Sequence, residues 1–176
     1  GDVERAFAEA ATIAEVEICH PRLAPSPMEP RAIAIRYDAA TDSATIYQST
    51  QTPHRSRSEF AKILQVDPDR LRVVAPAVGG AFGMKGSVYP EEVFAVWAAL
   101  HHRRNVKWTA SRSEDFLSAT HGRALVTRGR LALDADGNFT ALEAQVTAPV
   151  GPWLPNSVLI PAYNAARILP SGYAIP

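Results

Sequence analysis

The distribution of proline limits where this chain can form regular structure. Its 176 residues include 14 prolines, grouped mainly between Pro21 and Pro53 and between Pro149 and Pro176. Proline has no backbone N–H and a fixed φ, so it interrupts helices and central strands. We therefore expect no regular structure in the sequence CHPRLAPSPMEPR. The segment from Pro149 onward also shows no clear periodicity.

Helical and strand-like patterns interleave along the rest of the chain. Turn residues at 38–43 and the sequence DADGN predict two hairpins. We therefore predict an α+β fold, with a mixed sheet, hairpins and two to three packed helices. Apolar spacing predicts helices over residues 3–10, 53–64 and 90–102 and a short helix from Ser111, and strands over residues 12–18, 32–37, 44–48, 71–74, 106–109, 124–133 and 139–148.

Composition and charge argue against several classes of function. Lys plus Arg and Asp plus Glu each number 18, and a net charge of zero does not favour a nucleic-acid partner. No apolar run approaches the ~18 residues that indicate a membrane span. The single cysteine, Cys19, excludes an intrachain disulfide and favours a reducing compartment, so we expect a cytoplasmic protein. The 5 histidines form no i, i+4 pair, so no metal-ligand cluster is predicted.

A glycine-rich sequence, VGGAFGMKG, lies between a predicted strand and a predicted helix. We call residues 78–86 the glycine loop. Glycine lets the backbone approach a ligand closely and present its N–H groups to it. The loop matches neither the dinucleotide-binding motif nor the P-loop motif, which argues against an ordinary nucleotide-binding domain. Taken alone, it is better explained as a tight connection than as a cofactor site.

Two other polar segments are weak signals when each is taken alone. Gln51 can offer an amide to a ligand, but a turn residue ahead of a helix that begins at Thr52 and Pro53 is the simpler interpretation. Glu29 and Arg31 lie in a stiff, proline-rich segment, where they are close enough in sequence to pair with each other.

In their order along the chain, these segments resemble a known family. LAPSPMEPRA, YQSTQTPHRSRSEFAKIL, LRVVAPAVGGAFGMKGSVYPEE and VKWTASRSEDFL look like the large subunit of the molybdenum hydroxylases, the xanthine dehydrogenase, aldehyde oxidase and carbon monoxide dehydrogenase family. The details most resemble bacterial subunits of the carbon monoxide dehydrogenase type. The resemblance implies that the chain is a fragment of a larger molybdopterin-binding domain.

The resemblance also implies a division of the chain. Residues 1–148 would form the first molybdopterin-binding subdomain, and residues 149–176 a proline-rich tail that packs on the remainder of the subunit. Without that remainder, we expect the tail to be disordered or to pair with another copy. Its apolar residues are Trp153, Leu154, Val158, Leu159 and Ile160.

The same resemblance implies the roles of individual residues. The family glutamine that hydrogen-bonds the apical oxo ligand of molybdenum corresponds to Gln51. Ala81 replaces a usual glycine, which matters if that position requires positive φ. Gly86 stands where some members have a substrate-contacting glutamate, which argues against a xanthine-type purine pocket. The loop residues implied to contact the cofactor are Gly80, Ala81, Phe82 and Gly83.

The implied activity is that of a molybdenum-cofactor oxidoreductase, which hydroxylates an aldehyde or heterocycle, or oxidises carbon monoxide, with water as the oxygen source. The implied cofactors are molybdenum–molybdopterin, and iron–sulfur clusters and FAD on partner subunits or domains. The implied partners are the remainder of the large subunit, the iron–sulfur and FAD subunits, and a small-molecule substrate. The family's catalytic base falls outside this chain, so we expect the isolated chain to be inactive. The alternative is a non-catalytic structural or binding module that retains the family fold.

Overall fold

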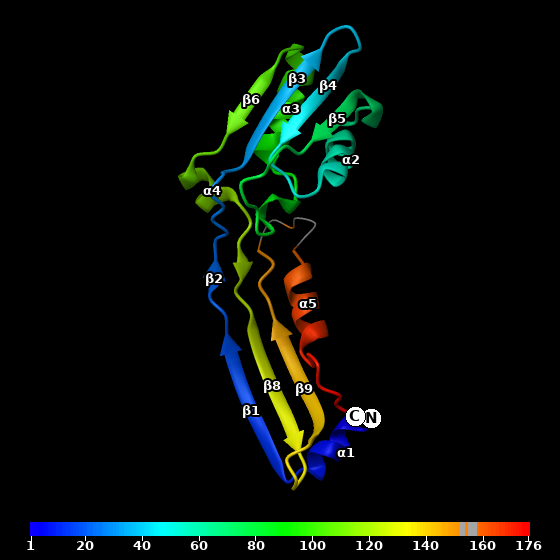
Figure 1. The fold of residues 1–176 in the computed structure, drawn as a ribbon, viewed down its shortest axis with the longest axis vertical. Helices are drawn as coiled ribbons and strands as arrows, with labels where there is room; N and C mark the ends of the chain where they lie inside the picture. The colour runs from blue at the N-terminus through cyan, green and yellow to red at the C-terminus, as the bar shows by residue number, and fades with distance from the viewer. Residues whose placement is uncertain (152–153, 155–157) are drawn as a thin grey trace. The chain divides into compact units, whose positions relative to one another are not determined.

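The computed structural model describes residues 1–151, 154 and 158–176 (Figure 1). The chain divides into two compact units, one of Gly1–Leu23 with Gly122–Pro176 and one of Ala24–His121. Both units combine helices with sheets, and one sheet is mixed, which confirms the predicted α+β fold. Among the described residues, no helix is both long enough and apolar enough to cross a membrane.

The Ala24–His121 unit is built on a four-stranded sheet with the strand order β5-β4-β3-β6 (Figure 1). β3 pairs antiparallel with both β4 and β6, whereas β5 pairs parallel with β4. A parallel pair needs a crossover, which α2 supplies between β4 and β5. The elements of this unit are β3 (Ala32–Asp38), β4 (Ser43–Gln48), α2 (Pro53–Leu64), η1 (Pro68–Arg70), β5 (Leu71–Val74), η2 (Met84–Gly86), α3 (Pro90–His102), β6 (Val106–Thr109) and α4 (Arg112–Ser118).

The core of this unit lies between the sheet and two helices. Alternate residues of β3 and β4 face inward, so Ile33, Ile35 and Ile46 are at most 2% exposed. α3 packs on β3, β4 and β6, and α2 packs on β5 and α3. Phe60 of α2 and Val96 of α3 are each 0% exposed and belong to the same cluster. β4 and β5 are therefore anchored in this apolar core, and the segments that follow each strand leave from it.

The other unit contains a three-stranded antiparallel sheet, β1-β8-β9, and a two-stranded ladder of β2 and β7. The β8–β9 hairpin forms at the predicted turn, where Gly137 has a φ of +82°. Asp134 fixes this turn by accepting hydrogen bonds from the backbone N–H groups of Asp136 and Asn138. The elements are α1 (Val3–Ala8), β1 (Thr12–Cys19), β2 (Arg22–Leu23), β7 (Gly122–Arg123), β8 (Val126–Leu133), β9 (Phe139–Thr147) and α5 (Ile160–Ile168).

Two elements form where the sequence predicts none. β2 lies inside the proline-rich segment that we expected to be irregular, because its ladder is short enough to fit between Pro21 and Pro25. α5 forms in the tail, with Pro161 in the first turn, where a missing N–H breaks no helical bond. α5 packs on β9, so disorder is the wrong expectation for Ile160–Ile168. The part of that expectation that concerns Trp153 lies outside the described residues.

Truncation of Phe60 tests whether the layer beneath the β4 end controls the stability of this unit. Phe60→Ala should lower the free energy of unfolding by about 3–5 kcal/mol, because it removes a fully buried ring and leaves a cavity. Ile63→Ala on the same helix is the control, since Ile63 is 56% exposed and should matter little. Urea denaturation compares the two variants. Equal losses would contradict the assignment of the core.

Candidate functional site

Gln51 and the glycine loop contact each other directly. The backbone N–H of Gly83 donates a hydrogen bond to Oε1 of Gln51 at 3.1 Å. The backbone N–H of Gln51 donates in turn to the carbonyl oxygen of Lys85 at 3.0 Å. Thr50, the residue before Gln51, donates its hydroxyl to the same carbonyl at 3.2 Å. The structure thus brings together Gln51 and Gly83, two predicted site residues that lie 32 positions apart in sequence.

The glycine loop has an unusual backbone conformation. Gly80 and Gly83 have φ values of +93° and +88°, and Phe82 has a φ of +52° although it is not glycine. A left-handed conformation at a residue with a side chain costs about 1–2 kcal/mol. Phe82 is also 76% exposed, so its phenyl ring gains little from packing within this chain. Strain and exposure at the same residue are typical of a functional position.

Ala81 does not share this strain. It is absent from the residues with positive φ, and it is 9% exposed. The replacement of the family's usual glycine by alanine therefore carries no conformational penalty at this position. Within the described part of the chain, the backbone N–H groups of Gly80, Ala81 and Phe82 donate no hydrogen bond. Three consecutive N–H groups thus have no acceptor among the described residues.

A carboxylate beneath the loop joins three segments of the chain. Oε2 of Glu29 accepts hydrogen bonds from the hydroxyl of Ser49 at 2.8 Å, from the N–H of Gly79 at 2.7 Å and from Nζ of Lys85 at 3.1 Å. Nζ of Lys85 also donates to the Glu29 carbonyl oxygen at 2.7 Å, and the Lys85 side chain is 0% exposed. We call Glu29, Ser49, Gly79 and Lys85 the Glu29 cluster. The expected pairing of Glu29 with Arg31 is wrong.

The Glu29 cluster keeps its acidic member ionised. Burial by itself raises the pKa of Glu29, but hydrogen bonds from Gly79, Ser49 and Lys85 outweigh burial and leave this pKa below its ordinary value. The side chain is therefore a carboxylate at neutral pH. A carboxylate has the lone pairs needed to accept from three donors at once.

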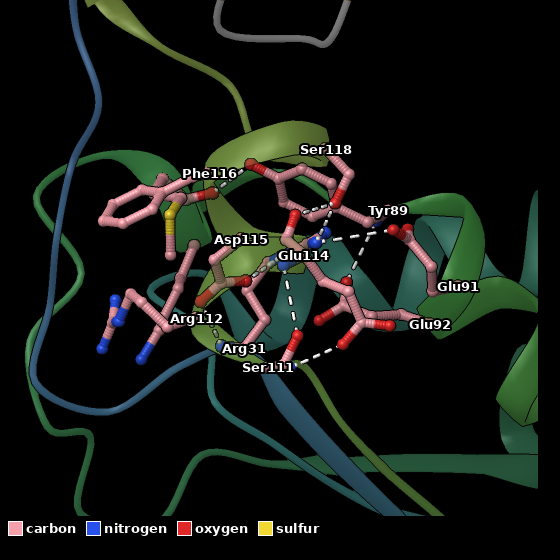
Figure 2. A network of polar contacts seen from close by, with 12 residues as sticks. Arg31, Tyr89, Glu91, Glu92, Ser111, Arg112, Glu114, Asp115, Phe116 and Ser118 are labelled. Carbon is pink, nitrogen blue, oxygen red and sulfur yellow. Dashed lines mark hydrogen bonds and ion pairs between the residues drawn. The ribbon is translucent and has the colours of Figure 1, made fainter.

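Arg31 instead forms a second buried network (Figure 2). Its Nε donates to Oδ1 of Asp115 at 2.8 Å, and neither side chain is exposed to solvent. Its Nη2 donates to the hydroxyl of Ser118 at 2.6 Å and approaches Oε1 of Glu91 at 3.4 Å. The backbone N–H of Arg31 donates to the other Asp115 oxygen at 3.2 Å. These contacts join the start of β3 to α3 and α4.

Tyr89 connects this network to the glycine loop. The Arg31 guanidinium lies over the Tyr89 ring, 4.0 Å from its centroid. The Tyr89 hydroxyl donates to the carbonyl oxygen of Met84 at 2.7 Å and is 2.9 Å from the hydroxyl of Thr120. Met84 follows Gly83 in the loop and is 1% exposed. The loop is therefore held at its C-terminal end by an aromatic side chain that itself rests on a buried cation.

Sequence reasoning missed the partners in both networks. Lys85 lies 56 positions from Glu29, and Asp115 lies 84 positions from Arg31. No local spacing signals such pairs. The only local hint was that Glu29, Arg31, Lys85 and Asp115 are charged residues inside the family-like segments.

The chain matches the family described as the molybdopterin cofactor-binding domain over residues 1–176. The chain belongs to this family. It is 34% identical over 176 residues to the gamma subunit of the 6-hydroxypseudooxynicotine dehydrogenase complex, and 31% identical over 180 residues to the nicotine 6-hydroxylase large subunit, both of Paenarthrobacter nicotinovorans. Each match includes 100% of this chain and 22% of the relative, so the chain spans less than a quarter of the length of these proteins.

Two further similarities agree with this family. The carbon monoxide dehydrogenase large chain of Hydrogenophaga pseudoflava is 30% identical over 145 residues, covering 82% of this chain and 18% of that protein. The crystal structure of quinoline 2-oxidoreductase from Pseudomonas putida 86 superposes with a TM-score of 0.89 at 28% identity. That match covers 99% of this chain and 22% of the solved chain.

The donors around Gln51 suit the cofactor named by this family. Among the described residues, Nε2 of Gln51 donates to no protein acceptor, and the side chain is exposed. The same amide is bonded to Gly83, which directly follows Gly80, Ala81 and Phe82, whose N–H groups have no acceptor among the described residues. A molybdenum–molybdopterin group is rich in oxygen acceptors, such as oxo ligands and phosphate. The residues present therefore fit the group.

Substitution of Arg31 tests the energetic role of its network. Arg31→Met should lower the free energy of unfolding by about 3–5 kcal/mol, because it leaves the buried Asp115 carboxylate without its cation. Arg31→Met with Asp115→Asn should lose less than Arg31→Met alone, because no uncompensated charge then remains. Arg5→Met is the control, since the Arg5–Glu9 pair is exposed. Urea denaturation distinguishes these cases, and an equal effect of Arg31→Met and Arg5→Met would contradict them.

Glu92 predicts a specific pH dependence of stability. Burial raises the pKa of Glu92 to about 7, although hydrogen bonds from Tyr89 and Gln48 oppose the shift. Between pH 4.5 and about 7 the unfolded chain loses this proton while the folded chain keeps it, so stability falls as pH rises. Across this window the wild type should lose about 3 kcal/mol relative to Glu92→Gln. Denaturation at several pH values measures the difference, and a gap independent of pH would contradict the assignment.

Proposed function

We propose that this chain supplies one wall of the molybdenum site in a molybdenum-cofactor oxidoreductase. The observation that carries the proposal is the hydrogen bond from Gly83 N–H to Gln51 Oε1. This bond places the two family-like segments against each other. It also orients the Gln51 amide so that its oxygen is used by the protein and its Nε2 is left for a ligand.

Each of these residues has a distinct task in the proposed site. Gln51 donates from Nε2 to an oxygen ligand of the metal and so fixes the orientation of the group. The free N–H groups of Gly80, Ala81 and Phe82 present positive dipole ends to the anionic parts of the cofactor. The exposed Phe82 ring forms an apolar surface beside these donors. When bound, molybdenum–molybdopterin supplies the redox chemistry that hydroxylates carbon with oxygen from water.

We propose N-heteroaromatic compounds as the substrate class. Two relatives and one solved structure that each match 99% or more of this chain are named for nicotine, a nicotine derivative and quinoline, and a relative that matches 97% is named as a probable hypoxanthine oxidase, whereas the carbon monoxide dehydrogenase chain matches 82%. Gly86 also fits this class, because it lacks the glutamate side chain that the resemblance assigns to purine-binding members at this position. A Cβ at position 86 would lie 3.8 Å from Oε1 of Gln51, so a longer side chain there would start beside the Gln51 amide.

The proposed context is a large subunit in the cytoplasm with electron-transfer partners. Residues 1–148 would form the first molybdopterin-binding subdomain, and residues 149–176 would pack on the remainder of the subunit. The exposure of Tyr163 and Ile168 supports the second point, since α5, described in full, contains no buried residue. Iron–sulfur clusters and FAD on partner subunits or domains would accept the electrons. The catalytic base would lie elsewhere in the subunit, so we expect the 176-residue chain alone to be inactive.

Metal analysis tests the proposed function. The complete protein that carries this sequence should contain molybdenum by mass spectrometry and a pterin by the fluorescence of its oxidised form. It should also be reduced by an N-heteroaromatic compound such as nicotine or quinoline in an anaerobic spectrophotometric assay. Absence of both metal and pterin would contradict the proposal and support the structural or binding module instead.

Gln51→Ala tests the role of the glutamine. The variant should keep its molybdenum but lose about 10–100-fold in kcat, the usual loss when a side chain that orients a metal centre is removed. Gln145→Ala is the matched control, because Gln145 lies exposed on β9 and should leave kcat unchanged. Steady-state kinetics at equal molybdenum content gives the answer. A Gln51→Ala enzyme with wild-type kcat would remove Gln51 from the site.

A further inference from the structure

We propose that Glu29 is a positioning residue, whose carboxylate sets the separation of Gln51 from the glycine loop and thereby the orientation of the Gln51 amide toward the metal. The inference rests on the proposed function for its catalytic consequence. Its structural part, the coupling between Glu29 and the Gln51–Gly83 contact, stands on the contacts in this chain alone.

The geometry supports this role because Glu29 binds both sides of the contact. On the Gln51 side it accepts from Ser49, two residues before Gln51. On the loop side it accepts from Gly79 at the start of the loop and from Lys85 near its end. A single oxygen, Oε2, is common to all three bonds. A shift of this oxygen would therefore act on both segments at once.

Lys85 transmits the same constraint directly to Gln51. Its ammonium is held by the carbonyl and carboxylate oxygens of Glu29, and its own carbonyl accepts from the Gln51 N–H. The Lys85 side chain is fully buried, so water cannot take the place of a lost hydrogen-bond partner of its ammonium. Glu29 is 34% exposed at its side chain and is the carboxylate of this pair. Loss of that carboxylate would leave the ammonium with only the Glu29 carbonyl oxygen as acceptor, and would so loosen the residue whose backbone holds Gln51.

Gly79 lies so close to Glu29 that the cluster has no room for a side chain at position 79. A Cβ built at Gly79 would lie 2.6 Å from the Cβ of Glu29, which is closer than two such atoms can approach. Glycine is needed here for space rather than for conformation, since Gly79 is not among the residues with positive φ. Gly79→Ala would thus push the loop away from Glu29 while leaving every charge in place.

The test measures amide hydrogen exchange and the molybdenum spectrum of the complete protein. In the cofactor-free protein, Glu29→Gln and Gly79→Ala should each speed exchange of the Gly83 N–H about tenfold, the effect expected when one positioned hydrogen bond is lost. Exchange is resolved to single amides by mass spectrometry with electron-transfer fragmentation. In the loaded protein, both variants should shift the Mo(V) electron paramagnetic resonance spectrum and lower kcat more than they raise KM.

Glu4→Gln is the matched control, because Glu4 is exposed and lies in the other compact unit. Faster exchange at Gly79 alone, with Gly83 exchange and the Mo(V) spectrum unchanged, would overturn the proposal and leave Glu29 with a local role. If Glu29→Gln fails to fold, Gly79→Ala decides the question, since it retains the Glu29–Lys85 pair. A wild-type protein without molybdenum would contradict the proposed function. The exchange rate of the Gly83 N–H would still decide whether Glu29 is coupled to the Gln51–Gly83 contact.

Discussion

A buried lysine that must keep its charge paired is the constraint on which the site depends. Lys85 has no exposure to solvent, so its ammonium requires oxygen acceptors within the protein, and Glu29 supplies both of them. Because the same carboxylate also holds Ser49 and Gly79, satisfying one buried charge fixes three separate segments. The exposed Gln51 side chain is therefore positioned through the buried Lys85 and its partners.

The site also depends on a rigid support beneath it. β4 ends at Gln48, after its inward-facing residues have joined the apolar core, and the next residues carry the polar groups that meet the loop. The loop itself is held by the Tyr89 hydroxyl, which donates to the carbonyl oxygen of Met84. The Tyr89 ring packs against the Arg31 guanidinium, which is paired with Asp115. The Arg31–Asp115 pair and the apolar core thus support the loop, whereas the strained Phe82 is exposed.

Much of this architecture could be predicted from the sequence, and the reason is that its signals are local. Alternation in residues 32–48, the proline and acidic residues that open α3, and the DADGN turn each act within a few residues, and the structure confirms all three. The Gln51–loop contact was predictable only through family resemblance. The pairs Glu29–Lys85 and Arg31–Asp115 join distant segments, and the short sequence distance between Glu29 and Arg31 pointed to the wrong partner. α5 was missed because its apolar residues follow no clear helical period.

We propose above all that the Gln51 amide and the free N–H groups of Gly80, Ala81 and Phe82 face a bound molybdenum cofactor. A cryo-electron microscopy structure of the complete protein, at a resolution that shows side chains and the metal, tests it most directly. We expect metal density with an oxygen ligand within hydrogen-bond distance of Gln51 Nε2, and cofactor atoms next to Gly80, Ala81 and Phe82. Metal density remote from these residues, or a glycine loop buried against polypeptide alone, would contradict it.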